Sequence, residues 1–371
     1  MKTKVLIDLC LLNNLNTGLG QVSYNYGEAV SKAKADDLDI TFLVPEEFVG
    51  KFGPQVSYIA VSKKYMYFPF LFPKFDIWHC ISHRARYVPI NFKTKVIFTI
   101  HDLVFHLRKG AHKKRTFHRT QRRINEMDCI CTISNYVADD IRQHFDLRGK
   151  RIEVIYNGVK QFNVDQEKKP NFILSERPYF FTIGQITGRK NFFVLLDMMK
   201  LMPEYDLYIA GENYSEAAVQ MKTKIETENI TNVFLPGTIM EEEKIWMYGH
   251  SQAFFFPSLF EGFGMPVIEA MSFGKPVFSS IFTSLKEIGK NFSFYWDNFE
   301  PESMKTVVMN GISAFYAHPE KIETQKEYAA SFSYGKNVNA YLNLYRKLAL
   351  TKKTKISFFT LFIRYLTMII K

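Results

Sequence analysis

Two glutamates and two glycines lie close together in this chain and form its best candidate for a chemical site. Glu261 and Glu269 bracket a loop that contains Gly262 and Gly264. Glycines let backbone amides approach a ligand closely, and a helix N-terminus directly after such a loop favours phosphate. Carboxylates accept hydrogen bonds from hydroxyl groups. The segment therefore predicts a phosphate-binding loop with a hydroxyl-reading acid on each side, which suits a ligand built from a sugar, a diphosphate and a ribose.

The elements that must position this loop follow an α/β alternation. A buried apolar run ends at Pro257, and Pro266 suits the first turn of a helix that stops near Gly274. Similar apolar runs predict strands in the first half at residues 5–9, 40–44, 77–81, 96–100, 129–133 and 153–156. In the second half they predict strands at residues 179–183, 207–210, 233–235, 253–256, 277–279 and 292–295. Helical patterns lie between most of these runs, so we predict two doubly wound, Rossmann-like domains that face each other across a cleft.

Composition limits the other possibilities. The chain has 371 residues, a net charge of +11, 47% hydrophobic residues and four cysteines. Bulk disorder and a disulfide scaffold are therefore excluded, and Cys129 and Cys131 are expected to be packed thiols. Asp8 interrupts the first apolar run, so we expect no signal peptide, and no apolar run reaches the ~20 residues of a membrane span. The charge is uneven: +9 in residues 1–165, −3 in 166–350 and +5 in 351–371.

Residues 256–271 resemble the E-x7-E motif of the retaining family 4 glycosyltransferases of GT-B fold, and residues 274–280 resemble its usual continuation. The resemblance implies that Glu261 contacts donor-sugar hydroxyls near the reacting centre and that Glu269 contacts the ribose of the nucleotide. It also implies that the backbone amides around Phe263, Gly264 and Met265 hold the donor.

Residues 181–191 carry a second point of resemblance. The family has an arginine soon after the strand glycine and a lysine several residues later, and both neutralise the donor diphosphate as it leaves. Lys190 matches the lysine, whereas Gln185 stands at the arginine position. Arg189 is the candidate to supply the missing charge, as the Arg-Lys-Asn variants of the family suggest.

The first half of the chain carries further family landmarks. Gly18 and Gly20 follow the first predicted strand and resemble the N-terminal glycine loop, which passes close to the donor phosphates. His101 and Asp102 end a buried strand and resemble the family's His-Asp pair. We assign His101 positioning and electrostatic stabilisation, since the resemblance implies that the donor phosphate itself accepts the acceptor proton from the front side.

The resemblance implies an enzyme: a retaining hexosyltransferase that uses GDP-mannose or a UDP-hexose and extends a lipid-linked or polysaccharide acceptor of the bacterial surface, such as lipopolysaccharide, O-antigen or capsule. It implies no cofactor beyond the nucleotide-sugar, and no metal. One alternative is a GT-B sugar-nucleotide epimerase or phosphorylase, and the E-x7-E segment argues against the epimerase. Another is a non-enzymatic, basic nucleic-acid-binding protein. No recognised nucleic-acid module supports it, so nucleic acid is not an expected partner.

We predict a division into an acceptor-side domain at residues 1–165, a nucleotide-sugar-binding domain at 166–349 and a basic amphipathic tail at 350–371. Residues 331–348 resemble the family's last helix, which crosses back toward the first domain. The segment 161–178 is polar and proline-bearing, and we interpret it as the linker.

Two basic segments predict contact with an anionic membrane. Half of residues 108–123 are Lys or Arg, and residues 351–371 combine five basic residues with an aromatic and aliphatic helical pattern. A solvated basic face is the alternative for the first segment, and a helix packed on the protein body for the second. We therefore expect a cytoplasmic enzyme that is peripheral on the inner face of the cytoplasmic membrane.

Overall fold

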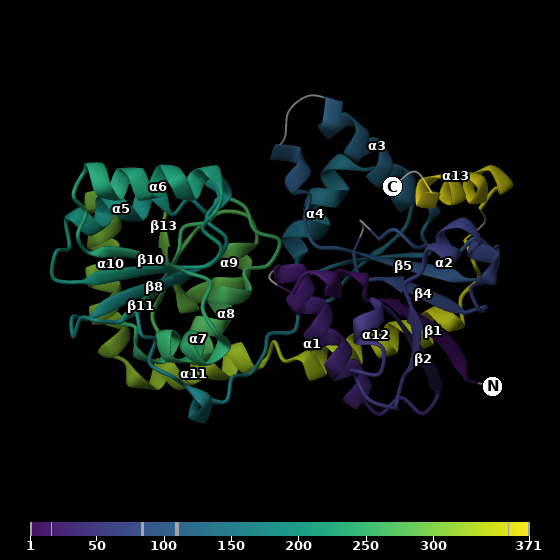
Figure 1. Cartoon of the computed structure of the whole chain (residues 1–371), viewed down its shortest axis with the longest axis horizontal. Helices are drawn as coiled ribbons and strands as arrows, with labels where there is room; N and C mark the ends of the chain where they lie inside the picture. The colour runs from purple at the N-terminus through teal and green to yellow at the C-terminus, as the bar shows by residue number, and fades with distance from the viewer. Residues whose placement is uncertain (1, 16, 83–84, 108–110, 355, 370–371) are drawn as a thin grey trace. The chain divides into compact units, whose positions relative to one another are not determined.

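The chain folds into two units in a computed structural model that describes residues 2–15, 17–82, 85–107, 111–354 and 356–369 (Figure 1). Unit 1 comprises Met1–Gly158 and Tyr334–Lys371, and unit 2 comprises Val159–Ser333. The chain thus enters unit 2 before residue 165, where the sequence analysis placed the boundary. It returns to unit 1 at Tyr334. The helix that resembles the family's last helix and the basic tail therefore both belong to unit 1.

Unit 1 is built on a parallel sheet with the strand order β3-β2-β1-β4-β5-β6-β7. Its strands are β1 (Thr3–Asp8), β2 (Leu38–Val44), β3 (Ser57–Ala60), β4 (Ile77–Cys80), β5 (Lys95–Ile100), β6 (Cys129–Thr132) and β7 (Ile152–Val154). Its helices are α1 (Gly18–Lys32), α2 (Lys63–Tyr67), α3 (Ala111–Glu126), α4 (Asn135–His144), α12 (Tyr334–Ala349) and α13 (Phe358–Ile369). Short 3-10 helices lie at Cys10–Asn13, Glu46–Phe48, Pro69–Leu71 and Val104–Leu107.

Helices cover both faces of this sheet. Successive side chains of a strand point to opposite faces, and apolar side chains on both faces must be buried. Val5 and Ile7 of β1 pack in one cluster with residues of α1 and α12, whereas Leu6 packs in another with Trp78 of β4 and Met66 of α2. Burial on both faces explains why the strands are continuous apolar runs rather than alternating ones.

Unit 2 repeats the topology with the parallel order β10-β9-β8-β11-β12-β13. Its strands are β8 (Tyr179–Ile183), β9 (Asp206–Ala210), β10 (Val233–Gly237), β11 (Ala253–Phe256), β12 (Val277–Ser280) and β13 (Ser293–Trp296). Its helices are α5 (Phe193–Lys200), α6 (Glu216–Thr227), α7 (Glu241–His250), α8 (Met265–Ser272), α9 (Ser284–Gly289), α10 (Pro301–Tyr316) and α11 (Pro319–Ala330). Short 3-10 helices lie at Val164–Gln166, Gly188–Lys190 and Lys290–Phe292.

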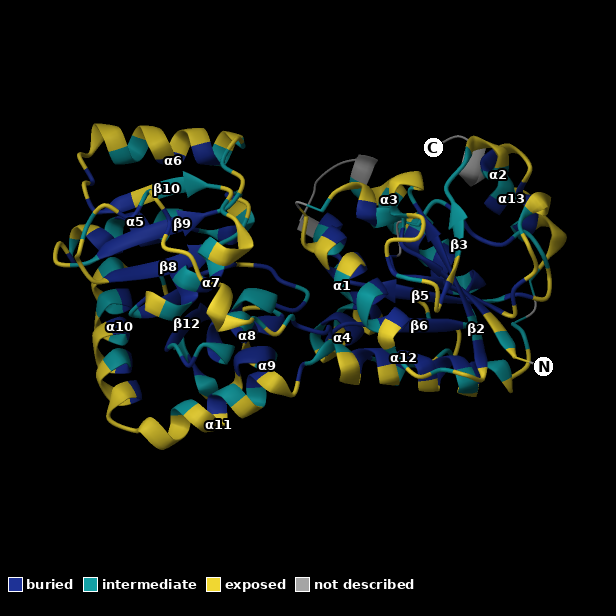
Figure 2. Ribbon diagram, turned by 60° about the horizontal axis from the view of Figure 1, so that its bottom comes forward, coloured by how far each residue is buried: buried dark blue, intermediate teal, exposed yellow. Residues whose placement is uncertain are grey.

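Phenylalanines fill the core of unit 2 on both sides of its sheet. Phe180 and Phe255 pack with helices α5 and α10, whereas the ring of Phe181 lies 5.1 Å from that of Tyr248 on α7. Figure 2 shows the buried strands in dark blue and the exposed outer faces of the helices in yellow. The predicted fold class, two doubly wound parallel α/β sheets, is confirmed.

All twelve predicted strands are present, with ends shifted by one or two residues in most cases. The strand that the sequence analysis missed is β3. It pairs with β2 alone at the edge of the sheet, and none of its four residues is fully buried. Its last three residues belong to the apolar run 58–61, which the sequence analysis overlooked. Cys129 and Cys131 are free, buried thiols on β6, as predicted.

A buried polar network fastens α12 to the sheet of unit 1. His79 on β4 hydrogen-bonds through Nδ1 to the Tyr345 hydroxyl at 2.6 Å and through Nε2 to Thr99 Oγ1 at 2.9 Å. Tyr26 on α1 joins at 2.8 Å from Tyr345, and Tyr341 hydrogen-bonds to Thr99. Burial lowers the pKa of His79 to about 3, so the imidazole is neutral and the network is built from uncharged groups.

The basic segment at residues 108–123 lies mainly on α3, with residues 108–110 outside the described residues. Lys114 and Arg115 are exposed, but Arg123 is buried. Its Nη2 donates to the Ala85 carbonyl at 3.1 Å, its guanidinium lies 5.2 Å from the ring of Phe98, and burial lowers its pKa to about 10. Part of this basic cluster is therefore structural. None of the described helices is long and apolar enough to cross a membrane.

Candidate active site

The loop after β8 brings two cations to the carboxyl edge of the sheet in unit 2. Arg189 and Lys190 lie in the 3-10 helix Gly188–Lys190. Gly184 directly follows β8 with φ +153°, and a Cβ atom there would lie 3.1 Å from Cε of Lys190. A glycine at this position therefore lets the lysine side chain lie directly against the strand end.

The loop after β11 brings the first glutamate of the motif to these cations. Lys190 Nζ lies 2.8 Å from Glu261 Oε1, and Arg189 Nη1 lies 3.3 Å from Glu261 Oε2. β8 and β11 are neighbours at the point where the strand order of the sheet reverses. Ligands of open α/β sheets bind at this switch point, outside the carboxyl ends of the strands.

The ion cluster is largely withdrawn from water, since Glu261 is 9% exposed and Lys190 8%. Burial acts to raise the pKa of Glu261, but the charges of Lys190 and Arg189 and the hydrogen bond from Lys190 hold it below its ordinary value. Burial lowers the pKa of Lys190, and the Glu261 carboxylate opposes that effect. The cluster therefore holds two cations and one anion, and this surplus positive charge suits an anionic ligand.

Contacts from the start of α9 and the residue before it fix the backbone of the Glu261 loop. The Glu261 N–H donates to Thr283 Oγ1 at 2.9 Å, and Ser284 Oγ lies 2.9 Å and 3.0 Å from the carbonyl oxygens of Glu261 and Phe263. Gly264 has φ +103°, and a Cβ atom there would lie 2.6 Å from a methyl of Leu285. Only glycine fits this turn.

The residues after the turn start α8. The ring of Phe263 is buried 5.7 Å from that of Phe332, so this residue has its backbone rather than its ring to offer a ligand. Met265 begins α8, and Pro266 occupies its first turn, as the sequence predicted. Peptide groups of Phe263, Gly264 and Met265 thus lead into a helix N-terminus, which carries a partial positive charge.

Glu269 does not join the Glu261 cluster. Its Oε2 accepts a hydrogen bond from the Tyr248 hydroxyl at 2.9 Å, and its Oε1 lies 3.5 Å from Lys244 Nζ. Both partners lie on α7. Gln185, at the position of the family's arginine, donates to Glu212 Oε2 at 2.9 Å instead of reaching the cluster.

In unit 1, His101 directly follows β5, and its ring is positioned by a residue that follows the neighbouring strand β4. Its Nε2 lies 2.7 Å from the carbonyl oxygen of Ile81. Because a carbonyl only accepts, Nε2 carries the proton and Nδ1 is left as the acceptor of the neutral ring. Burial lowers the pKa of His101, which favours this neutral form.

The glycine loop of unit 1 also requires glycine for a steric reason. A Cβ atom on Gly20 would lie 2.0 Å from the carbonyl oxygen of Asn14. Gly18 is the first residue of α1, and the side chain of Thr17 caps this helix by accepting the Gly20 N–H at 3.1 Å. The first turn of α1 therefore packs tightly against the backbone of the loop that precedes it.

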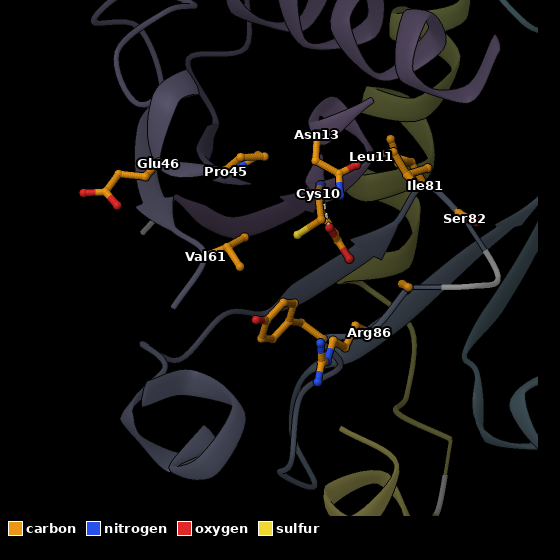
Figure 3. Close-up of a pocket in the computed structure, with 12 residues that line it drawn as sticks. Cys10, Leu11, Asn13, Pro45, Glu46, Val61, Ile81, Ser82 and Arg86 are labelled. Carbon is orange, nitrogen blue, oxygen red and sulfur yellow. Dashed lines mark hydrogen bonds between the residues drawn. The ribbon is translucent and has the colours of Figure 1, made fainter. Parts of the chain in front are cut away.

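A pocket of about 430 Å³ lies at the carboxyl edge of β1 to β4, and the sequence analysis did not find it (Figure 3). Its polar lining includes Asp8, Asn13, Glu46 and Arg86. Asp8 Oδ1 accepts the Cys10 N–H at 2.9 Å, and burial raises the Asp8 pKa. The available signal was position, because Asp8 interrupts the apolar run of the first predicted strand and Glu46 follows the second.

Known proteins are similar to this chain over nearly its whole length. Residues 41–161 match the family model Glycosyltransferase Family 4, and residues 163–332 match the model Glycosyl transferases group 1. The chain belongs to the family 4 glycosyltransferases of GT-B fold. The O-antigen chain mannosyltransferase RfbU of Salmonella typhimurium is 23% identical over 354 residues, which are 89% of this chain and 96% of that protein.

Solved structures agree with this glycosyltransferase fold. The sucrose-phosphate synthase of Thermosynechococcus elongatus superposes with a TM-score of 0.75 at 15% identity, over 94% of this chain and 99% of that one. HepE of Anabaena, in complex with UDP and glucose, superposes with a TM-score of 0.69 at 14% identity, over 94% and 100% of the two chains. The predicted family and the prediction of a glycosyl-transferring enzyme are confirmed, whereas the roles of individual residues remain predictions.

Proposed function

We propose that this glycosyltransferase moves a hexose, with retention of configuration, from a nucleotide-sugar to a lipid-linked glycan of the bacterial surface. The similarity to an O-antigen mannosyltransferase over almost the full length supports an O-antigen or related acceptor. It also favours GDP-mannose as the first donor to test, with a UDP-hexose second. Family membership favours a transferase over the epimerase and over the nucleic-acid-binding protein.

The observation that carries the proposal is the cluster of Lys190, Arg189 and Glu261 at the switch point of unit 2. In our proposal, Lys190 and Arg189 bind the donor diphosphate and stabilise the negative charge that grows on it as the sugar leaves. Glu261 then turns from these cations to the sugar hydroxyls. Glu269 reads the ribose, and the peptide groups of residues 263–265 hold the phosphates at the start of α8.

The proposed reaction exchanges one bond to the anomeric carbon for another. The bond from that carbon to the diphosphate oxygen breaks, and a bond to the acceptor oxygen forms on the same face. The acceptor proton passes to the departing phosphate oxygen, so no protein side chain has to act as the general base. His101 contributes positioning and electrostatic stabilisation, and Gly18 and Gly20 allow the α1 loop to approach the donor phosphates.

We place the acceptor in unit 1, and its pocket at the ends of β1 to β4 is the candidate site for an acceptor sugar. The pocket volume of about 430 Å³ and its hydrogen-bonding groups suit a hydroxyl-rich ligand. Exposed cations of α3 such as Lys114 and Arg115, together with the tail, support attachment to an anionic membrane surface. The proposed location is accordingly the inner face of the cytoplasmic membrane.

The test is a screen of the purified enzyme for donor hydrolysis and transfer with GDP-mannose, UDP-glucose and UDP-galactose. We expect one donor to be consumed and to raise the melting temperature, because a ligand that binds only the native state stabilises it. The anomeric configuration of the product, read by proton NMR, decides between retention and inversion. Consumption of none of these donors, with no nucleotide-dependent stabilisation, would contradict the proposal.

A further inference from the structure

The last helix, α13, is anchored to unit 1 through its charged residue. Arg364 is 3% exposed, and its Nε lies 3.1 Å from Glu126 Oε2. Its Nη1 and Nη2 donate to the carbonyl oxygens of Pro89 and Glu126, each at 3.1 Å. Lys353, just before the helix, forms an ion pair with Asp128. These two cations of the tail are thus paired with unit 1 and turned away from solvent.

The opposite side of α13 is apolar and exposed. Phe358 is 79% exposed, Phe359 70% and Phe362 51%, whereas Leu361 is buried. In α13, the charged side chain of Arg364 therefore faces unit 1, and the three phenylalanines face solvent. Full burial of such a side chain is favourable by about 1.5–3 kcal/mol, so three exposed phenylalanines on one helix face indicate a surface that becomes covered.

A second segment of unit 1 extends this apolar surface. The Tyr365 hydroxyl donates to the Tyr67 carbonyl at 3.3 Å, which joins α13 to the end of α2, and the two helices lie side by side in both ribbon views (Figures 1 and 2). Phe68 is 51% exposed and Phe70 77%. Phe92 is half exposed, with its ring 6.3 Å from that of Phe358. We call the set Phe68, Phe70, Phe92, Phe358, Phe359 and Phe362 the aromatic face.

An open groove of about 740 Å³ runs into the aromatic face. Its apolar lining comes from Phe75, Ile90 and Phe92 on one side and from Leu361, Phe362 and Tyr365 of α13 on the other. Lys74 and Lys93 stand at this groove and are exposed. The groove thus combines an apolar floor with cationic groups at its edge.

The charges around this surface favour one kind of partner. The segments that form it, residues 61–76, 90–95 and 351–366, contain a single acidic residue, Asp76, among many lysines. Lys63, Lys64, Lys74 and Lys93 are exposed around the phenylalanines. Aromatic and aliphatic side chains surrounded by lysines suit the boundary between anionic headgroups and acyl chains.

We propose that the aromatic face inserts into one leaflet of an anionic lipid bilayer, with α13 lying in the membrane interface and the groove taking up one acyl chain. The proposal rests on the proposed function, in which the acceptor is lipid-linked, and it names the lipid contact of that function. It differs from attachment through the cations of α3, because burial of phenylalanines is insensitive to salt, whereas contacts of exposed charges are screened.

The test is cosedimentation of the full chain with vesicles of phosphatidylglycerol and phosphatidylethanolamine, at 0.1 M and 0.5 M NaCl. One variant carries Phe358→Ser, Phe359→Ser and Phe362→Ser. The matched control carries Leu174→Ser and Tyr214→Ser, which remove exposed apolar side chains of unit 2 that are 90% and 84% exposed. We expect wild type and control to bind at both salt concentrations and the triple variant to lose at least tenfold in vesicle affinity, with an unchanged melting temperature.

Three outcomes would overturn the proposal: no binding of the wild-type chain, equal binding of the triple variant, or binding of both that disappears at 0.5 M NaCl. Self-association of the wild type that the triple variant abolishes, without vesicle binding, would assign the face to a protein partner and overturn it as well. Donor hydrolysis is measured without vesicles on the same preparations. If the wild-type chain binds vesicles but hydrolyses no donor, the result would count against the proposed function alone.

Discussion

The two units share one topology but use their switch points differently. In unit 2, the loops after β8 and β11 meet in a buried ion cluster in which Lys190 lies 2.8 Å from Glu261. In unit 1, the loops after β1 and β4 leave an open pocket of about 430 Å³ between Asp8 and Arg86. Topology therefore determines where a ligand can bind, and the residues that follow the strands determine which ligand. A preassembled ionic site suits a diphosphate, and an open pocket with a few hydrogen-bonding side chains in its lining suits a hydroxyl-rich acceptor.

The largest effect that we expect is on the cluster of unit 2. Glu261→Gln should lower the transfer rate by about 10²–10³-fold, because it replaces a charged carboxylate by a neutral amide with a single acceptor oxygen for the sugar hydroxyls in the transition state. The same change leaves Lys190 without its buried counter-ion, so the free energy of unfolding should also fall. Steady-state kinetics and urea unfolding measure the two effects. The control is Glu226→Gln, on an exposed part of α6, and near-wild-type transfer by Glu261→Gln would refute the assignment.

The next largest effect concerns the diphosphate. Lys190→Met should lower kcat/KM for the donor by about 10–10²-fold and weaken inhibition by the free nucleoside diphosphate, because one charge-assisted contact is lost. Lys200→Met, on the exposed side of α5, is the matched control. If the nucleoside diphosphate inhibited both variants equally, Lys190 would not be a ligand of the donor diphosphate.

The two units should also respond differently to acid. The pKa of His79 in unit 1 is lowered from 6.5 to about 3, so below pH 6.5 the unfolded chain binds a proton that the folded unit does not accept. The free energy of unfolding should fall by about 1.4 kcal/mol per pH unit from pH 6.5 downward. The pKa of Glu261 in unit 2 is lowered from 4.5. Its contribution to the free energy of unfolding is therefore present above pH 4.5 and is lost only below it.

Unit 1 is therefore predicted to weaken first as the pH falls, and hydrogen exchange of β4 against β11 between pH 7 and 5 measures the difference. His79→Gln keeps hydrogen-bonding groups but does not titrate, so it should flatten the pH dependence in unit 1. The control is His118→Gln, at an exposed position on α3, which should leave it unchanged. Equal pH dependence in wild type and His79→Gln would contradict the assignment.

The smallest effect is expected in the pocket of unit 1. Glu46→Gln should raise the acceptor KM a few-fold and leave donor hydrolysis unchanged, because one hydroxyl contact of about 1 kcal/mol is weakened. Glu47→Gln is an ideal control, since this exposed neighbour does not line the pocket. If both variants behaved alike, the acceptor would have to bind elsewhere.

The sequence predicted the regular part of the fold well because most of its buried parallel strands are short apolar runs that alternate with helical patterns. It also predicted that Lys190 and Glu261 belong to one site, and the structure brings them into contact. It could not predict the orientation of α13, because a helical pattern does not say which face packs. Arg364 turned out to be the anchor and Phe358 the exposed group.

Residues whose role depends on their spatial neighbours escaped the sequence analysis. Asp8 and Arg86 lie far apart in the chain and meet only through the pairing of β1 with β4. The partner that holds Glu269, Tyr248, is likewise set by the packing of α7 against α8 rather than by spacing. Arg189, inferred from the departure at Gln185, lies 3.3 Å from Glu261, and its role at the donor diphosphate stays a prediction.

A crystal structure of the enzyme with bound GDP or UDP tests the central claim most directly. The account predicts that diphosphate oxygens lie within about 3 Å of Lys190 Nζ and beside Arg189, at the carboxyl edge of β8 and β11. It also predicts that the Glu261 carboxylate is released from Lys190. A diphosphate bound elsewhere, with the pair of Lys190 and Glu261 left intact, would contradict it.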